Sequence, residues 1–278
     1  MFPPRFLVLI LLAICLLGAC ITGNNGPSPP PQQPPSAKED NLAMGNPSSA
    51  SASNPDNYLL AKTQYALSYN STKGIANWVS WHLSPVWKGY EARCNCFSPD
   101  GALPQGYKIA VSNLYSNSGY DRGHLCPSDD RDCNPDDNAA TFAMSNIAPQ
   151  AINLNRDVWQ KLEYYCRKLL SEGNELYIIA GTYGQKSKIG GQIIVPSNFW
   201  KVVVVLKEGE SDLSRINSQT RLIAVDMPNE ENVNQYYWSH YRTTVNSIEK
   251  ITGYDLLSAL PVDIQRSLES QVDTGPVR

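Results

Sequence analysis

The feature of this sequence that most restricts its fold is the imbalance between strand-like and helix-like segments. A clear helical pattern covers residues 156–170, where apolar and aromatic side chains recur every three or four positions. A weaker helical pattern covers residues 241–252. Many strands and few helices predict an α+β domain built on a largely antiparallel central sheet flanked by helices. The β-rich runs behind this prediction are residues 65–69, 78–83, 108–114, 141–144, 176–180, 199–206 and 221–226.

The N-terminal part of the chain lacks the composition of a folded domain. Residues 1–19 combine one Arg with a nearly unbroken apolar stretch that ends in Leu-Gly-Ala before Cys20, which is the pattern of an export signal. This ending resembles a bacterial lipobox, in which Cys20 would be lipidated and become the new N-terminus. The alternative is an ordinary secretory signal in which Cys20 is incidental. Residues 20–57, rich in Pro, Ser, Asn and Gly, predict a disordered linker.

These observations predict one folded domain over residues 58–278, which is long enough for a proper core. They also predict an exported protein that is secreted, periplasmic or lipid-anchored to the membrane surface.

The cysteines of the predicted domain leave several pairings open. An oxidising destination permits disulfides, and Cys126 with Cys133 would close a short loop. The odd number of cysteines leaves at least one thiol free or paired outside the domain. A structural zinc module is an alternative, but its C-x-C and C-x₆-C spacing does not suit the usual zinc knuckles. The domain cysteines are Cys94, Cys96, Cys126, Cys133 and Cys166.

One of the three histidines stands in a sequence suited to catalysis. His124 ends the string Asp-Arg-Gly-His at residues 121–124. A histidine flanked by Gly, an Arg and an acid can act as a general base with help in phosphate binding. A structural histidine in a turn is the alternative at this position. His82 is expected in or beside a strand, and His240 in an aromatic cluster, where structural roles are favoured.

Further polar residues precede and occupy the long predicted helix. Ser-Asn-Ile-Ala-Pro-Gln at residues 145–150 is followed by Asn-Leu-Asn-Arg at 153–156. Taken one at a time, these residues have ordinary structural explanations. Asn153 or Asn155 would cap the helix, and Glu163 with Arg167 would form an ion pair on its surface.

Together these segments resemble the DNA/RNA non-specific endonucleases of the ββα-metal type. The match runs through YDRGHLCPSDDR, ATFAMSNIAPQ and NLNRDVWQKLE within residues 120–163, in the family's order and spacing. It extends to ELYIIAGTYG at 175–184 and VPSNFWKVVV at 195–204. The DRGH string alone would be a weak indicator, whereas the three segments at this spacing form a strong one. The resemblance implies that residues 58–278 form a nuclease domain with a ββα-metal active-site motif.

The resemblance also implies a role for each matching position. His124 would take a proton from the attacking water, and Asn155 would be the direct protein ligand of one Mg²⁺ or Mn²⁺ ion. Glu163 follows Asn155 by eight residues, about 12 Å along an ideal helix, and would act on the ion through a water. Arg93 would stabilise the pentacoordinate phosphate, and Asp121 would orient its neighbouring arginine or the turn. Contacts to phosphate or substrate are implied for Arg122, Gln150 and Arg167.

The implied function is hydrolysis of phosphodiester bonds in DNA and RNA without sequence or sugar specificity, leaving 5′-phosphate and 3′-hydroxyl ends. A site that holds one phosphate contacts only the backbone, which carries no sequence information. The formal net charge of −3 counts against a DNA-packaging protein but permits a local basic groove. The acidic residues between 129 and 137 are interpreted as solvated loop charges, with a cation site as the alternative.

A rival interpretation is a surface nucleic-acid-binding lipoprotein with an inactive nuclease fold. The joint presence of His124, Asn155 and Glu163 argues against it. The partners implied by the resemblance are DNA and RNA substrates and a dedicated inhibitor protein. A membrane partner is expected only through an N-terminal lipid anchor.

Overall fold

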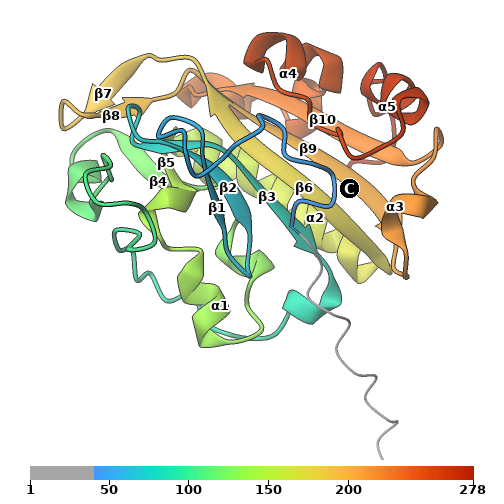
Figure 1. Ribbon diagram of the computed structural model, residues 1–278, viewed down its shortest axis with the longest axis horizontal. Helices are drawn as coiled ribbons and strands as arrows, with labels where there is room; N and C mark the ends of the chain where they lie inside the picture. Colours follow the sequence, from blue (N-terminus) through green and yellow to red (C-terminus); the bar gives the residue numbers. More distant parts are fainter. Residues whose placement is uncertain (1–40) are drawn as a thin grey trace, which may run out of the picture. The chain divides into compact units, whose positions relative to one another are not determined.

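The computed structural model describes residues 41–278. Its centre is a six-stranded antiparallel sheet in the order β1-β2-β3-β6-β9-β10 (Figure 1). The predicted α+β class with a largely antiparallel central sheet is therefore confirmed. The strands are β1 (Tyr58–Ala61), β2 (Ala66–Asn70), β3 (Ile75–Leu83), β6 (Asn174–Tyr183), β9 (Asn198–Lys207) and β10 (Arg221–Pro228).

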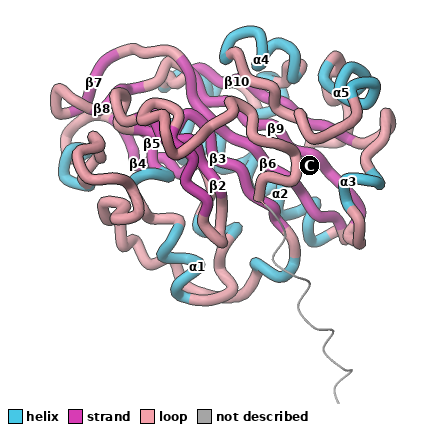
Figure 2. Tube along the Cα trace, viewed as in Figure 1, coloured by secondary structure: helices cyan, strands magenta, loops and turns pink. Residues whose placement is uncertain are grey.

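Both faces of this sheet are buried. Successive side chains of a strand point to opposite faces, so in β6 Leu176 and Ile178 join one apolar cluster while Tyr177 and Ile179 join another. The helix α2 (Gln160–Ser171) contributes to the first cluster. The helices α4 (Val245–Thr252) and α5 (Val262–Glu269) contribute to the second (Figure 2).

A smaller hairpin stands beside the central sheet and leads into α2. Its strands, β4 (Tyr120–His124) and β5 (Ile147–Ala151), pair in antiparallel register, with Gly123 opposite Ala148. A π-helical turn at Leu154–Trp159 then continues into α2. This strand–strand–helix order is the predicted ββα motif. The remaining elements are α1 (Pro135–Ala140), β7 (Ser187–Ile189), β8 (Ile193–Val195) and α3 (Asp212–Arg215).

The predicted strands at residues 108–114 and 141–144 do not form. Both runs contain residues with high β-propensity, but a strand also requires a partner along its length. The carbonyl of Lys108 instead accepts a hydrogen bond from the Tyr69 hydroxyl at 2.7 Å. The segment 141–144 makes only an isolated bridge between Ala143 and Ser98.

The folded part of the chain begins earlier than predicted. Residues 41–57 are not a free linker, because Met44 and Ala50 are buried in the cluster beneath α4 and α5. Hydrogen bonds hold the polar remainder: Trp78 donates its indole N–H to Ser48 Oγ at 2.8 Å. The composition misled the prediction because these contacts use side-chain oxygens rather than large apolar groups. The predicted signal at residues 1–19 and Cys20 lie outside the described residues.

The cysteine pairing also differs from the predicted loop closure. Cys94 and Cys96 form a disulfide, while Cys126 and Cys166 are buried free thiols. Cys126 and Cys133 are therefore not joined, and a shared zinc site on these cysteines is not formed. The expectation that at least one domain thiol stays unpaired is confirmed.

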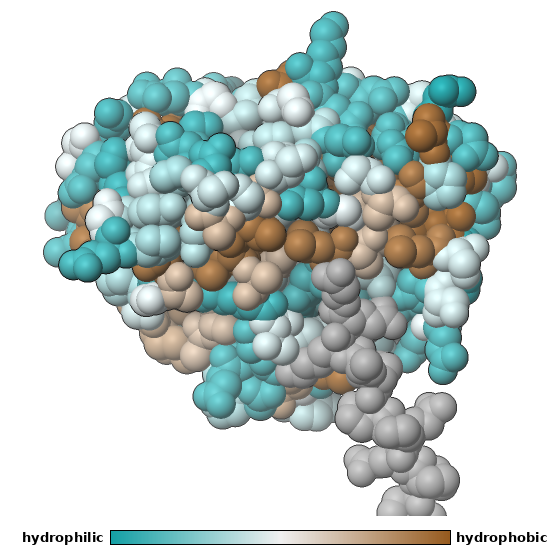
Figure 3. Space-filling model, viewed as in Figure 1, coloured by the Kyte–Doolittle hydropathy of each residue, from teal (hydrophilic) through white to brown (hydrophobic). Residues whose placement is uncertain are grey.

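The face of the molecule shown in Figure 3 is mostly polar. On this face, hydrophilic residues predominate and hydrophobic residues form limited groups between them. Across residues 41–278, no helix combines the length and the apolar character needed to cross a membrane.

Candidate active site

A cavity of about 250 Å³ between β4 and α2 gathers side chains from four separate stretches of the chain. We call it the β4–α2 cavity. Six of the eight residues to which the family resemblance gives a role line it, although they span residues 93 to 167 in the sequence. They are Arg93, Arg122, His124, Asn155, Glu163 and Arg167.

His124 ends β4 and faces this cavity with a neutral imidazole. Its ring packs edge-on against Phe142, with 4.8 Å between ring centroids, and also against Phe97. Burial, together with the positive charges of Arg93 and Arg122, lowers the pKa of His124 from 6.5 to about 3. Within the described residues, the buried Nε2 atom has no hydrogen-bond partner. A neutral imidazole with an unengaged nitrogen can accept a proton.

Asn155 is oriented by Asp121. Its amide Nδ2 donates to Asp121 Oδ2 at 2.9 Å, which directs the carboxamide oxygen away from that contact. Asp121 is itself held by two hydrogen bonds of 2.7 Å from Arg156. Of the two roles expected for Asp121, orienting Arg122 is not seen, since Arg122 donates to Ser112 Oγ. Nor does Asn155 cap the helix, because it lies inside the π turn.

The π turn explains how Asn155 and Glu163 reach the same cavity. In an ideal α-helix, two side chains eight residues apart differ by about 80° in direction. A π turn, closed by i→i+5 hydrogen bonds, takes more residues per turn and reduces this angle. Residues 154–159 form such a turn, whereas the sequence pattern predicts a regular helix from residue 156. The chain thus places both side chains on one wall of the cavity.

Glu163 faces a buried lysine that is not among the predicted site residues. Lys201, in the middle of β9, is 1% exposed, and its Nζ lies 4.0 Å from Glu163 Oε1. The ammonium also lies 4.2 Å from the centroid of the Trp159 ring. Burial raises the pKa of Glu163 to about 7, while the charges of Lys201 and Arg167 oppose this rise. The only signal in the sequence is one Lys within an otherwise apolar strand.

Arginines give the rest of the cavity its positive charge. Arg93 donates to Ser128 Oγ at 2.8 Å and lies over the Phe142 ring. The guanidinium of Arg122 stacks over Phe97, 4.3 Å from its centroid. Such exposed, pre-oriented guanidinium groups suit a phosphate.

Arg167 differs from the other arginines because acids already engage it. It pairs with Asp130 at 3.1 Å and with Asp129 at 3.5 Å. Within residues 41–278 it makes no ion pair with Glu163, so the surface-pair explanation of these two residues is not realised. Its guanidinium is thus less available to a substrate than those of Arg93 and Arg122.

Gln150 is not brought to the cavity. It is fully buried in β5, and its side chain packs against Gly123 on the neighbouring strand. A Cβ at position 123 would lie 2.6 Å from Gln150 Cβ, so this packing requires Gly. The structure therefore does not support a substrate contact by Gln150. Its place in β5, directly opposite Asp121, makes it part of the hairpin's support.

The oxygen ligands in this cavity fit a hard divalent cation. Asn155 Oδ1 accepts no hydrogen bond from the residues described, and Glu163 offers a carboxylate. Mg²⁺ and Mn²⁺ prefer oxygen ligands, and Mg²⁺ commonly keeps several waters while one or two protein groups bind it. The donor set of the cavity is therefore chemically suited to such an ion.

Comparison with known proteins finds relatives that are all nucleases. The profile of the family described as DNA/RNA non-specific endonuclease matches residues 44–263. A protein named Nuclease from Nostoc sp. is 49% identical over 235 residues, covering 84% of this chain and 85% of that protein. The mitochondrial nuclease EXOG of Danio rerio is 30% identical over 213 residues, covering 71% of this chain and 60% of that protein.

The fold also has a counterpart among solved structures. A chain in the crystal structure of the EndoG/EndoGI complex aligns with a TM-score of 0.67 and 23% identity. The alignment covers 81% of this chain and 95% of that chain. At this identity the likeness bears on the fold alone.

Proposed function

Because this chain belongs to the DNA/RNA non-specific endonuclease family, we propose that it hydrolyses DNA and RNA at the β4–α2 cavity with one divalent cation. The observation that carries this proposal is the convergence of a neutral His124 and an oriented Asn155 on one arginine-lined cavity. The proposed products carry 5′-phosphate and 3′-hydroxyl ends.

His124 is the proposed general base. At neutral pH its imidazole is uncharged, because its pKa lies near 3. It can therefore take a proton from a water that attacks phosphorus. The two Phe rings beside it limit the orientations of the imidazole. A base with a low pKa is a weak proton acceptor, so the position and orientation of this imidazole carry much of its contribution.

Asn155 is the proposed direct ligand of Mg²⁺ or Mn²⁺, and Glu163 is proposed to hold the ion through a water. When bound, such an ion supplies electrostatic stabilisation of the charge that develops on the phosphate and the leaving oxygen. Asp121 fixes the Asn155 amide through its nitrogen and so presents the oxygen. Lys201 favours the ionised form of Glu163, because its charge lowers the pKa of that carboxyl. These two contacts prepare the oxygen ligands.

Arg93 and Arg122 are the proposed binders of the scissile phosphate. Both groups lie beside His124, close enough for their charges to lower its pKa. Phosphate contacts position a nucleic acid without reading its bases. A site built from guanidinium groups around one phosphate is therefore consistent with cleavage that ignores sequence and sugar.

We also propose that the protein is exported and that a protein inhibitor controls it. The signal-like sequence of residues 1–19 and the Cys94–Cys96 disulfide support export, since disulfides persist in oxidising compartments. Cys20→Ser distinguishes the two export routes: loss of membrane association supports a lipid anchor, and unchanged fractionation contradicts one. The structure of the EndoG/EndoGI complex, which concerns the mechanism of EndoG inhibition, supports the search for an inhibitor.

A digestion assay tests the proposed activity. The protein is incubated with supercoiled plasmid and with RNA, with EDTA or with added Mg²⁺ or Mn²⁺. We expect cleavage of both substrates with either cation and none with EDTA. Absence of cleavage under all conditions would instead support an inactive nucleic-acid-binding protein. Cleavage that persists in EDTA, or that only Zn²⁺ restores, would contradict the hard-cation site.

A further inference from the structure

Three carboxylates meet on the opposite face of the central sheet from the β4–α2 cavity. Glu249 lies in the last turn of α4, Asp255 follows that helix, and Glu269 is the last residue of α5. Each offers an oxygen, and these oxygens lie within 4.8 Å of one another. The two helices lie next to each other in Figure 1 and belong to the apolar cluster that does not include α2.

One of these carboxylates is buried without a partner. Glu269 is 6% exposed, and its Oε1 atom makes no hydrogen bond to any described residue. Glu249 accepts one backbone hydrogen bond, from Leu256 N at 2.9 Å. Across residues 41–278 no Lys, Arg or His forms an ion pair with any of the three acids. A buried carboxylate normally has such a partner, because its desolvation is costly.

The surroundings of the cluster add to its negative potential. The last carbonyl groups of a helix carry partial negative charge, and both α4 and α5 end at this cluster. Burial, together with the charges of Glu249 and Asp255, raises the pKa of Glu269 to about 7. Without a counterion, the site can relieve this repulsion only by holding a proton.

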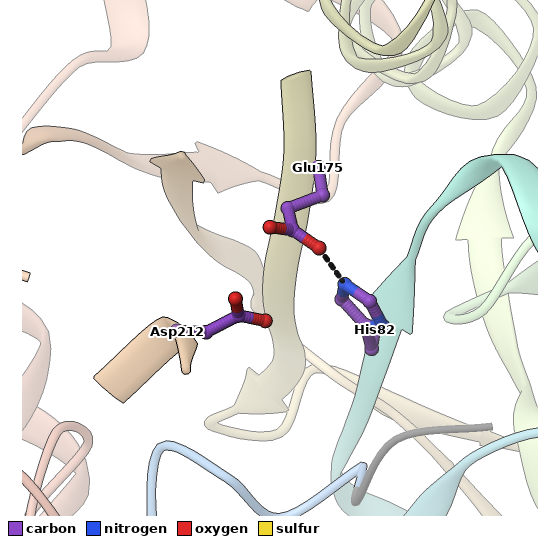
Figure 4. Close-up of side chains that lie close together, drawn as sticks. All are labelled: His82, Glu175 and Asp212. Carbon is purple, nitrogen blue, oxygen red and sulfur yellow. Dashed lines mark hydrogen bonds and ion pairs between the residues drawn. The ribbon is translucent and has the colours of Figure 1, made fainter. Parts of the chain in front are cut away.

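In a second acidic cluster of this protein, a basic side chain balances the charge of the carboxylates. Glu175 and Asp212 lie close to His82, which contacts Glu175 at 3.1 Å (Figure 4). Arg215 forms ion pairs with both carboxylates, and Tyr177 donates its hydroxyl to Asp212 at 2.6 Å. The negative charge is thus balanced by the protein's own cation, which the cluster at α4 and α5 does not have.

We propose that Glu249, Asp255 and Glu269 form a Ca²⁺ site that ties α4 to α5. Ca²⁺ binds carboxylate oxygens at about 2.3–2.6 Å, so ligands on opposite sides of the ion are up to about 5 Å apart. The observed oxygen spacing falls within this limit. Asp255 is exposed, which gives an ion access from solvent. The site is separate from the proposed catalytic ion because the sheet stands between them.

Thermal unfolding of the full chain tests this site. The unfolding midpoint is measured in EDTA and in increasing Ca²⁺ for the wild type, Glu269→Gln, Asp255→Asn and Glu208→Gln. The last variant removes an exposed acid from a distant loop and matches the change in charge. Any Ca²⁺ bound in the β4–α2 cavity contributes equally to all four proteins. Beyond any response shared by all four proteins, we expect a further saturable rise of about 5 °C at Ca²⁺ a hundredfold above Kd, and we expect it in the wild type and Glu208→Gln only.

Tb³⁺ provides a second readout that does not depend on stability. Tyr254 precedes Asp255, so excitation of its ring should sensitise emission from Tb³⁺ bound at the cluster. Added Ca²⁺ should displace this signal, and Glu269→Gln or Asp255→Asn should abolish it. Equal Ca²⁺ responses in all four proteins, or none in the wild type, would overturn the proposal. A wild-type midpoint that depends on pH near 7 but not on Ca²⁺ would also overturn it and assign a buried proton instead.

Discussion

Two clusters of ionisable side chains, on opposite faces of the central sheet, differ in the sign of their unbalanced charge. Alternation along β9 sends Lys201 to the α2 face, while its neighbours Trp200 and Val202 point to the α4 and α5 face. The α2 face supports a cavity rich in arginine, and the other face supports three carboxylates without a basic partner. One face therefore suits a phosphate and the other a cation. Charge of one sign that the protein itself does not balance indicates the sign of the ligand that a cluster can bind.

The largest expected effect is a loss of turnover that leaves the opposite face of the sheet unchanged. His124→Ala should lower turnover by about 10²-fold or more, the usual cost of a lost general base. The change removes a buried ring, so folding is checked by the unfolding midpoint and by the Ca²⁺ response of the other face. Both should persist. Turnover within a fewfold of the wild type would remove His124 from the mechanism and the cavity from its catalytic role.

Glu163 offers a graded test on the same face. Glu163→Gln keeps the side-chain length and one acceptor oxygen, so it should impair turnover less than Glu163→Ala. We expect losses of about 10- to 100-fold, typical of residues that orient a metal site without dominating it. Turnover is measured at saturating Mg²⁺. Nearly full activity of Glu163→Ala would return Glu163 to a structural role on α2.

Lys201 should act through Glu163 and therefore change the pH profile. Its charge lowers the pKa of Glu163, so Lys201→Met should raise that pKa and leave more Glu163 protonated at pH 7. Activity at pH 7 should fall about 3- to 10-fold and recover at higher pH. Rate–pH curves for wild type and Lys201→Met measure the shift, and Lys201→Arg should restore part of it. A uniform loss at every pH would indicate a purely structural lysine.

The smallest expected effect concerns Gln150. Because its side chain is buried away from the cavity with no hydrogen-bond partner among the described residues, Gln150→Met should leave kcat/KM within a fewfold of wild type. The swap conserves volume and removes unsatisfied polar atoms, so stability should hold or rise slightly. A selective rise in KM would restore Gln150 to substrate binding.

Long apolar runs made much of the fold predictable. The strands β3, β6, β9 and β10 are strongly patterned, whereas the hairpin strand β4 is short and partly polar and β5 contains a proline. The spacing of apolar residues does not predict this hairpin, and only the family resemblance points to residues 120–124 and 147–151. The strands β4 and β5 were not predicted, and the strands predicted at 108–114 and 141–144 do not form. Both errors have one cause, because whether a segment pairs as a strand depends on tertiary structure.

Site residues were predictable where a motif fixes their chemistry and not where distant packing does. His124 and Asn155 stand in recognisable strings, and both reach the cavity. The contact between Asp121 and Asn155 joins residues 34 positions apart. It depends on a π turn, whereas the helical pattern predicts a regular helix. In the sequence, Lys201 is one polar residue in a predicted apolar strand, and nothing there indicates its role. Its approach to Glu163 follows only from α2 packing on the sheet.

The dependence of cleavage rate on metal concentration tests the central claim, that His124 and Asn155 perform separate tasks in one cavity. The rate is measured against Mn²⁺ concentration for wild type, His124→Ala and Asn155→Ala, with higher enzyme concentrations for the slow variants. His124→Ala should lower the maximal rate but leave the half-saturating Mn²⁺ concentration unchanged. Asn155→Ala should raise that concentration by more than about tenfold. An unchanged half-saturating concentration in Asn155→Ala, or an equal rise in His124→Ala, would contradict the account.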